Sequence, residues 1–282
     1  MLAQAPDALT PDALAANVLL PARRKVILHY HLFKNAGTSV DQMLKAHFGK
    51  RWRAAEAPHR AWGPAEIGKW LLAHPGVTVL SSHTAQLPVP CIDGLEIFPV
   101  MFLRHPLDRA RSVYEFERKQ AANTKGAVMA KQHSLKDYIA WRIGPMGDRT
   151  IRDFQCARLA QGTPALGKPP LAEELRAQQT LHSLPFIGIV ESFDESVRRL
   201  QGYLVPTFPR IQLSPTKANV TQTRASTLGQ RLEQLEADLG PEVYGQLVSA
   251  NRRDLALYNE ALQRNGSAQN GAQKNELTAG AG

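Results

Sequence analysis

Short apolar runs alternate with amphipathic segments along most of the chain. Runs with strand character occupy residues 25–32, 77–80, 97–103 and 186–190. Apolar residues at helical spacing follow at residues 40–48, 65–73, 107–119, 135–143, 171–181, 192–204, 231–239 and 241–263. Strands that alternate with helices predict an α/β fold, in which helices cover both faces of a central parallel sheet.

The same pattern indicates one folded domain over residues 25–265. Residues 1–24 are rich in Ala, Pro and Leu, and we expect them to form an arm ahead of the domain. Residues 266–282 are rich in Gly, Ala, Asn and Gln without an apolar period, and we expect them to be disordered. The Pro- and Gly-rich stretches 162–170 and 206–215 are expected connections.

The first strand-like run leads into a glycine turn with a lysine and two hydroxyl residues. It continues as His31-Leu-Phe-Lys34-Asn35-Ala36-Gly37-Thr38-Ser39. Strand, loop and helix in this order place backbone N–H groups and the positive end of a helix dipole around an anion. In a Walker loop the lysine directly follows the last glycine, whereas Lys34 precedes Gly37 by three residues. The loop therefore indicates a phosphate site of another kind.

A second strand-like run ends in Arg104-His105-Pro106 and continues as a helical pattern past Ser112. Pro106 suits the first turn of a helix, where its missing N–H is no loss. Arg104 and Ser112 could both contact one phosphate, because a guanidinium fork and a hydroxyl suit phosphate oxygens. The alternative is an Arg104 paired with Asp108 and a solvated Ser112.

Together the two segments resemble sulfotransferases that use 3′-phosphoadenosine-5′-phosphosulfate (PAPS). The similar branch is the carbohydrate type, related to heparan sulfate 2-O-sulfotransferases and their bacterial relatives. The family's loop resembles H-x-P-K-T-A-G-T-S, and its second segment resembles L-R-[DN]-P-x-x-R-x-x-S-x-Y. This chain departs from these patterns at Phe33, Asn35 and His105, and none of the three removes a charged contact. Weaker similarity extends over roughly residues 25–262.

The resemblance implies a P-loop-like three-layer fold and a PAPS site built by both segments. It assigns the 5′-phosphosulfate to Lys34, Asn35, Ala36, Gly37, Thr38 and Ser39. It assigns the 3′-phosphate to Arg104 and Ser112, helped by a late loop with Lys217, Asn219 and Thr221. Thr38 and Ser39 could instead cap the helix, as Thr and Ser commonly do. Arg109 and Arg111 are expected on the surface.

The expected general base is His83, which follows the second strand-like run and Ser82. A histidine with a near-neutral pKa at the carboxyl end of a strand suits proton abstraction from a sugar hydroxyl. In the family that the chain resembles, the histidine of a Gly-His pair after this strand is the base. In this chain Ser82 replaces that glycine. The alternatives are a structural histidine bonded to a backbone carbonyl, and Glu56 as the base. His29 and His31 share one face of the first strand and are expected to brace the loop, with His31 able to touch the cofactor.

Sulfuryl transfer moves SO3 from a phosphate to an acceptor hydroxyl or amine. The protein has to position both partners, deprotonate the acceptor and neutralise the charge that grows on the departing phosphate. We expect His83 to act as the base and Lys34 to stabilise the leaving 3′,5′-ADP, with no metal required. The acceptor stays open between glycans, lipid-linked sugars and small molecules, and between O- and N-sulfation.

The composition is basic, with a formal net charge of +9 and a pI of about 9.7. A basic balance favours an anionic partner. The chain has no Lys/Arg-rich block and no aromatic-basic RNA-binding pattern, so nucleic acid is not the expected main partner. The polyanionic cofactor and an acidic glycan would account for the charge. Candidate contacts for the acceptor are the basic segment 45–53, which includes Trp52, and Trp62. The alternative for each of them is ordinary surface or core packing.

No run approaches the ~18 apolar residues of a membrane span, and the N-terminal residues lack the basic region of a signal peptide. Cys91 and Cys156 form no disulfide framework, and no Cys/His cluster has zinc spacing. We therefore expect a cytoplasmic, bacterial protein with reduced thiols.

Two other functions stay open. One is a Mg²⁺-dependent nucleotide kinase or NTPase of related fold, which would need a Walker lysine at the position of Thr38. The other is a non-catalytic nucleotide- or glycan-binding protein that would bind 3′,5′-ADP and tolerate loss of His83.

Overall fold

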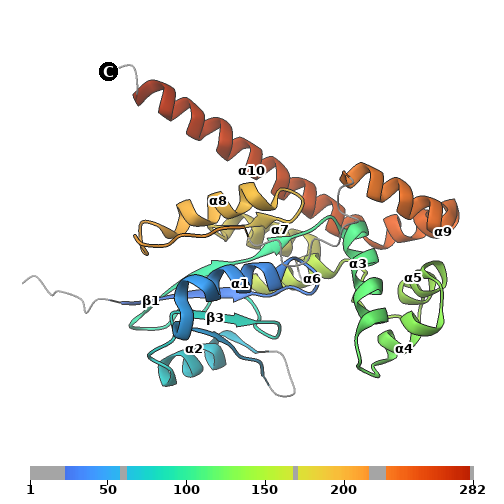
Figure 1. Cartoon of the computed structure of the whole chain (residues 1–282), viewed down its shortest axis with the longest axis horizontal. Helices are drawn as coiled ribbons and strands as arrows, with labels where there is room; N and C mark the ends of the chain where they lie inside the picture. Colours follow the sequence, from blue (N-terminus) through green and yellow to red (C-terminus); the bar gives the residue numbers. More distant parts are fainter. Residues whose placement is uncertain (1–22, 58–61, 168–170, 216–226, 280–282) are drawn as a thin grey trace, which may run out of the picture.

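A parallel sheet of four strands forms the centre of the molecule, in the order β2-β3-β1-β4 (Figure 1). The computed structural model describes residues 23–57, 62–167, 171–215 and 227–279, with side chains described as far as residue 266. The strands are β1 Arg24–Tyr30, β2 Trp52–Ala54, β3 Val79–Ser82 and β4 Leu95–Val100. Tyr30 pairs with Ser82, so β1 and β3 end together at one edge of the sheet.

Beyond β4 the chain enters a second sheet, which has two strands. β5 Phe102–Leu103 follows directly after Met101 and pairs in parallel with β6 Gly188–Ile189. The N–H of Gly188 donates to the Met101 carbonyl at 2.9 Å. The strand expected at residues 97–103 is therefore divided, because its first part pairs with β1 and its last part with β6.

Most expected helices are present with bounds close to those of the sequence pattern. The α-helices are α1 Gly37–Phe48, α2 Pro64–Ala73, α3 Pro106–Lys119, α4 Lys125–Gln132, α5 Leu135–Ile143, α6 Phe154–Leu159, α7 Glu173–Ser183, α8 Phe193–Leu204, α9 Leu228–Ala250 and α10 Arg252–Ala279. Short 3₁₀ turns occupy Gly49–Arg51 and Ala160–Gly162. The apolar pattern did not predict β2, α4 or α6.

Helices cover both faces of the sheet, which gives three layers. Successive side chains of a strand point to opposite faces. Ile27 of β1 shares one buried cluster with Val40 of α1 and Leu200 of α8. Leu28 shares another cluster with Leu71 of α2 and residues of α6, α7 and α10. The predicted α/β fold with a central parallel sheet flanked by helices is confirmed.

A third buried cluster packs α3 against α5 and α9. Leu107 and Val113 of α3 pack with Tyr138 of α5 and with Leu235 and Leu239 of α9. α3 begins directly after Arg104 and His105, so this packing fixes the helix that carries Ser112.

The C-terminal helices differ from the expectation in two ways. The sequence pattern placed a boundary between two helices at residues 239–241. In the structure this position is a kink inside α9, where Gly240 has a φ of 74° and Pro241 follows. The break lies instead at Asn251, whose Nδ2 donates to the carbonyls of Ile151 at 2.8 Å and Leu247 at 3.0 Å. α10 continues to Ala279 and includes residues 266–279 of the expected tail. Ala, Gln, Lys, Glu and Leu in this stretch favour helix even without an apolar period.

Within the described ranges, no helix combines the length and apolar character needed to cross a membrane.

Candidate functional site

A cavity of about 180 Å³ lies at the carboxyl edge of the sheet, where α/β proteins commonly bind ligands. Its lining residues are His31, Phe33, Lys34, Ala36, Gly37, Thr38, Ser39, His83, Arg104, Ser112, Phe116 and Val190. The structure thus brings the loop of the first motif, the Arg and Ser of the second motif and the candidate base to one cavity.

The loop between β1 and α1 has a special backbone. Lys34 and Ala36 lie in the left-handed region, with φ of 63° and 60°, which non-glycine residues seldom adopt. The chain therefore turns sharply before Gly37 starts α1. No described side chain caps the N-terminus of α1, and its first turn carries no acidic residue. This helix end is suited to an anion, and Thr38 and Ser39 line the cavity instead of capping the helix.

Lys34 extends toward the cavity wall that α3 contributes. Its Nζ lies 4.7 Å from the centre of the Phe116 ring, and both residues line the cavity. A cation over an aromatic face is attracted by the negative charge of that face. The Phe116 ring therefore helps to hold a positive charge beside the loop.

Arg104 takes part in a shared ion-pair group at the end of β5. Its Nε and Nη2 donate to Asp108 Oδ2 at 2.9 and 2.7 Å, and its Nη1 donates to the Lys34 carbonyl at 3.1 Å. Asp108 also accepts from Nε of Arg231 in α9 at 2.8 Å. Burial opposes ionisation of Asp108, but the two guanidinium groups lower its pKa below the ordinary value. Two cations around one carboxylate leave a net positive charge, so the Arg104–Asp108 pairing and a role in anion binding are compatible.

Gln155 of α6 joins the two motifs through its buried amide. Its Oε1 accepts from Asn35 Nδ2 at 2.7 Å and from the Arg104 N–H at 2.9 Å, and its Nε2 donates to the Arg104 carbonyl at 2.9 Å. Asn35 Nδ2 also donates to the Phe102 carbonyl at 2.8 Å. Asn35 is 1% exposed and is not among the cavity-lining residues. Its side chain anchors the loop, where a cofactor contact had been expected.

Arg109 is fully buried, so the expectation of a surface residue is wrong. Its Nη2 donates to the Thr150 carbonyl at 2.6 Å, and its Nη1 donates to the Phe33 carbonyl at 3.3 Å. Its guanidinium lies 4.3 Å from the centre of the Phe154 ring. Burial lowers the pKa of Arg109 to about 10. This side chain supports the loop from behind, and Arg111 forms an ion pair with Asp238.

His83 lies just after β3 and keeps access to solvent. Its Nδ1 donates to the His31 carbonyl at 3.0 Å, because a carbonyl only accepts. This bond selects the tautomer with an unprotonated Nε2. Partial burial and the neighbouring His31 lower the pKa of His83, so the imidazole is neutral near pH 7. The carbonyl bond of the structural alternative is present, and it leaves Nε2 able to accept a proton.

Glu56 holds the turn that carries His83. Its carboxylate accepts from the N–H groups of His83 and Thr84, both at 2.8 Å. It also accepts from the hydroxyls of Ser82 at 2.8 Å and Thr84 at 2.7 Å. Burial opposes its charge, but these hydrogen bonds lower the pKa of Glu56 below its ordinary value. A carboxylate engaged by four donors is a structural anchor, and the geometry favours His83 as the base.

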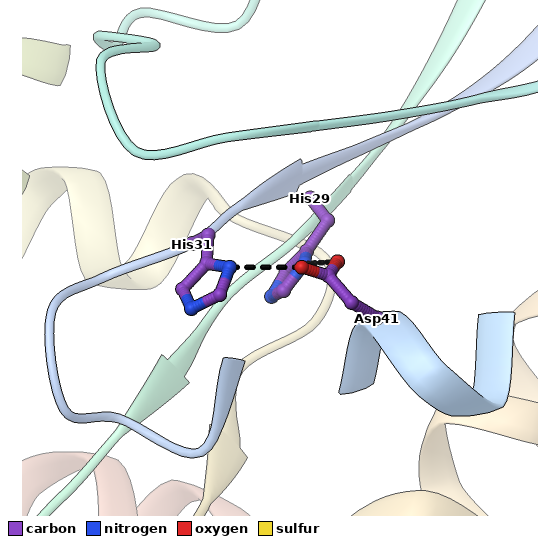
Figure 2. A group of neighbouring side chains, drawn as sticks. All are labelled: His29, His31 and Asp41. Atoms are coloured by element: carbon purple, nitrogen blue, oxygen red, sulfur yellow. Dashed lines mark hydrogen bonds and ion pairs between the residues drawn. The ribbon is translucent and has the colours of Figure 1, made fainter. Parts of the chain in front are cut away.

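Asp41 of α1 bridges two histidines at the end of β1 (Figure 2). Its Oδ1 lies 2.8 Å from His29 Nδ1, and its Oδ2 lies 2.9 Å from His31 Nδ1. Ser81 Oγ lies 3.1 Å from His29 Nδ1. Burial works against ionisation of Asp41, but His29 and the hydrogen bonds keep its pKa far below the ordinary value. His29 is buried and braces α1 on the sheet, whereas His31 lines the cavity.

Other expected contacts have different outcomes. Lys217, Asn219 and Thr221 lie outside the described residues. Trp62 is 7% exposed, and its ring lies 5.8 Å from that of Trp70, so it is a core residue. Trp52 is half-buried, with Lys45 Nζ 5.4 Å from its ring centre.

The contact between Gly37 and His31 leads to a stability prediction. A Cβ at Gly37 would lie 2.0 Å from Cδ2 of His31, so the imidazole would have to move. We expect Gly37→Ala to lower the free energy of unfolding by about 1–3 kcal/mol in urea denaturation. The matched control is Gly202→Ala in α8, where a Cβ meets nothing within 4 Å. That control should be neutral or stabilising by up to about 1 kcal/mol, and equal effects of the two substitutions would contradict the prediction.

The fold and the cavity define a three-layer α/β protein with a basic, cationic site at the carboxyl edge of its sheet. No protein-family model matches the chain. An uncharacterized protein of Archaeoglobus fulgidus is 31% identical over 248 residues, which cover 85% of this chain and 96% of the archaeal protein. The chain belongs to the same protein family as this archaeal relative.

Proposed function

We propose that the protein is a PAPS-dependent sulfotransferase that transfers a sulfuryl group to a hydroxyl of a carbohydrate acceptor. The observation that carries the proposal is the common cavity of Lys34, Gly37, Arg104, Ser112 and His83. These residues come from three separate segments that the sequence motifs singled out. Their convergence supports one site for a bisphosphorylated nucleotide with a base beside it.

The phosphate contacts divide between the two motifs. The N-terminus of α1 with Thr38 and Ser39 would hold the 5′-phosphosulfate, and Arg104 with Ser112 would hold the 3′-phosphate. Lys34 would neutralise the charge that develops on the oxygen of the leaving phosphate as the S–O bond breaks. A fixed ammonium can do this without a metal ion.

His83 is the proposed base. Its Nδ1–H is bonded to the His31 carbonyl, so Nε2 can take the proton of the acceptor hydroxyl as the new S–O bond forms. Its solvent access suits an acceptor that enters from outside. The formal net charge of +9 favours acidic glycans among the possible acceptors.

Ligand-dependent thermal stabilisation tests the proposal. At a ligand concentration of 100 times the Kd, 3′,5′-ADP should stabilise the folded protein by about 2.7 kcal/mol, with or without Mg²⁺. Arg104→Ala should weaken this stabilisation, because the 3′-phosphate loses a charged donor. The exposed Arg210 gives the control Arg210→Ala, which should leave it unchanged. Stabilisation by ATP or GTP with Mg²⁺ and none by 3′,5′-ADP would refute the proposal in favour of a kinase or NTPase.

A further inference from the structure

Asp41 determines which nitrogen of His31 can titrate. The carboxylate accepts at 2.9 Å from His31 Nδ1, and an ionised carboxylate only accepts, so Nδ1 carries a hydrogen. Asp41 is held in its ionised form by the two hydrogen bonds from His29 and His31. The Nε2 atom of His31 is therefore the position where a proton is gained or lost.

His31 Nε2 lies beside the start of α1. A Cβ built on Gly37 would be only 2.2 Å from this atom, so the ring lies directly against the first residue of the helix. His31 also lines the cavity. In Figure 2 the second ring nitrogen of His31 is turned away from Asp41. An anion at the helix N-terminus would consequently meet His31 Nε2.

The groups around His31 keep it neutral while the cavity is empty. Burial is the main cause that lowers its pKa, and His29 on β1 adds to it, against Asp41 and Glu56, which raise it. The ring of His83 lies 3.8 Å away, centre to centre. Lys34 and Arg104 line the same cavity and add positive charge. A bound anion reverses this balance, because an opposite charge beside Nε2 favours the imidazolium form.

We propose that His31 is a proton-coupled anion contact, whose Nε2 takes up a proton when the ligand binds and donates a hydrogen bond to its 5′-phosphate. The proton comes from solvent, and the Nδ1–H of His31 continues to donate to Asp41, which acts as a positioning residue. The inference rests on the proposed function, since it takes 3′,5′-ADP or PAPS as the ligand. Linkage fixes the direction of the pH dependence: because the ligand-bound form holds more protons, ligand affinity rises as pH falls from about 8. The rise ends where the imidazole of the free protein is itself protonated.

Calorimetric titration with 3′,5′-ADP tests this proton uptake. Binding is measured at pH 7.5 in Tris, HEPES and MOPS, with EDTA throughout, so that the dependence of heat on buffer ionisation enthalpy gives the number of protons taken up. We expect about one proton for the wild-type protein and about none for His31→Gln. The glutamine retains an amide donor, so that variant should still bind, with an affinity that no longer depends on pH between about 7 and 8.

Two further variants separate His31 from its neighbours. Asp41→Asn should reduce the uptake, because the neutral amide no longer stabilises the imidazolium. His83→Gln should keep the proton uptake. If His83 were the residue that takes up the proton, this substitution would abolish the uptake. An unchanged uptake in His31→Gln, or ordinary binding by the wild type without any uptake, would overturn the inference and leave the proposed function standing. Absence of 3′,5′-ADP binding at every pH would overturn both.

Discussion

Lys34→Ala should reduce the turnover of sulfuryl transfer from PAPS by about 10²–10³-fold, the range seen when one charge-stabilising group is removed from an active site. The reason is the position of the ammonium at the cavity wall, 4.7 Å from the Phe116 ring and beside the uncapped start of α1. The leaving phosphate would lose the cation that neutralises it. The measurement is release of 3′,5′-ADP with an acceptor obtained from a glycan screen.

The control for this substitution is Lys69→Ala, which removes an exposed lysine of α2 that does not line the cavity. It lowers the net charge by the same amount and should leave turnover within about twofold, because charges exposed to solvent are strongly screened. If Lys34→Ala and Lys69→Ala behaved alike, Lys34 would have no special part in the reaction.

His83→Ala should lower turnover by about 10²–10⁴-fold while 3′,5′-ADP still binds. In the proposed mechanism this side chain contributes the proton-accepting Nε2, and the phosphate contacts come from other residues. Its removal also takes away one hydrogen bond to the His31 carbonyl, so the folded state should be checked by thermal unfolding. Turnover and ligand affinity measured on the same preparation separate the two effects.

The exposed His133 gives the comparison His133→Ala, which should keep full turnover. Full activity in His83→Ala would end its assignment as the base. A protein that binds 3′,5′-ADP but transfers no sulfuryl group, with or without His83, would instead be the non-catalytic binding protein that the sequence left open.

The sequence predicted the elements whose signals are local. β1, α1, α3 and α5 follow from apolar periodicity and from Pro106 at a helix start. β2 has only three residues at the sheet edge, too few to show a period. α6 has six residues, and its first N–H groups donate to Asp254, at 3.0 Å from Gln155 and 2.7 Å from Cys156. A helix capped from 98 residues away leaves no local signal.

The candidate site follows the same division. Lys34, Arg104 and His83 could be predicted because each follows the end of a strand within a short motif, and Ser112 because it lies about two turns into the helix that follows Arg104. The residues that position them are distant in the sequence. Asn35 lies 120 residues from its partner Gln155, and Arg231 lies 123 residues from Asp108. Such partners become visible only once the chain is folded.

The amide of Gln155 has a consequence for ligand choice. It is bonded to Asn35 of the first motif and to both backbone groups of Arg104 in the second. Side chains this deeply buried and bonded on each side do not adjust independently. The amide therefore fixes the distance between the two motifs, so the two proposed anion subsites would meet a bound nucleotide at a preset separation. If the proposed function holds, selection among nucleotides would depend on how far apart their phosphates lie, and 2′,5′-ADP, with the same charges at another spacing, should bind more weakly than 3′,5′-ADP.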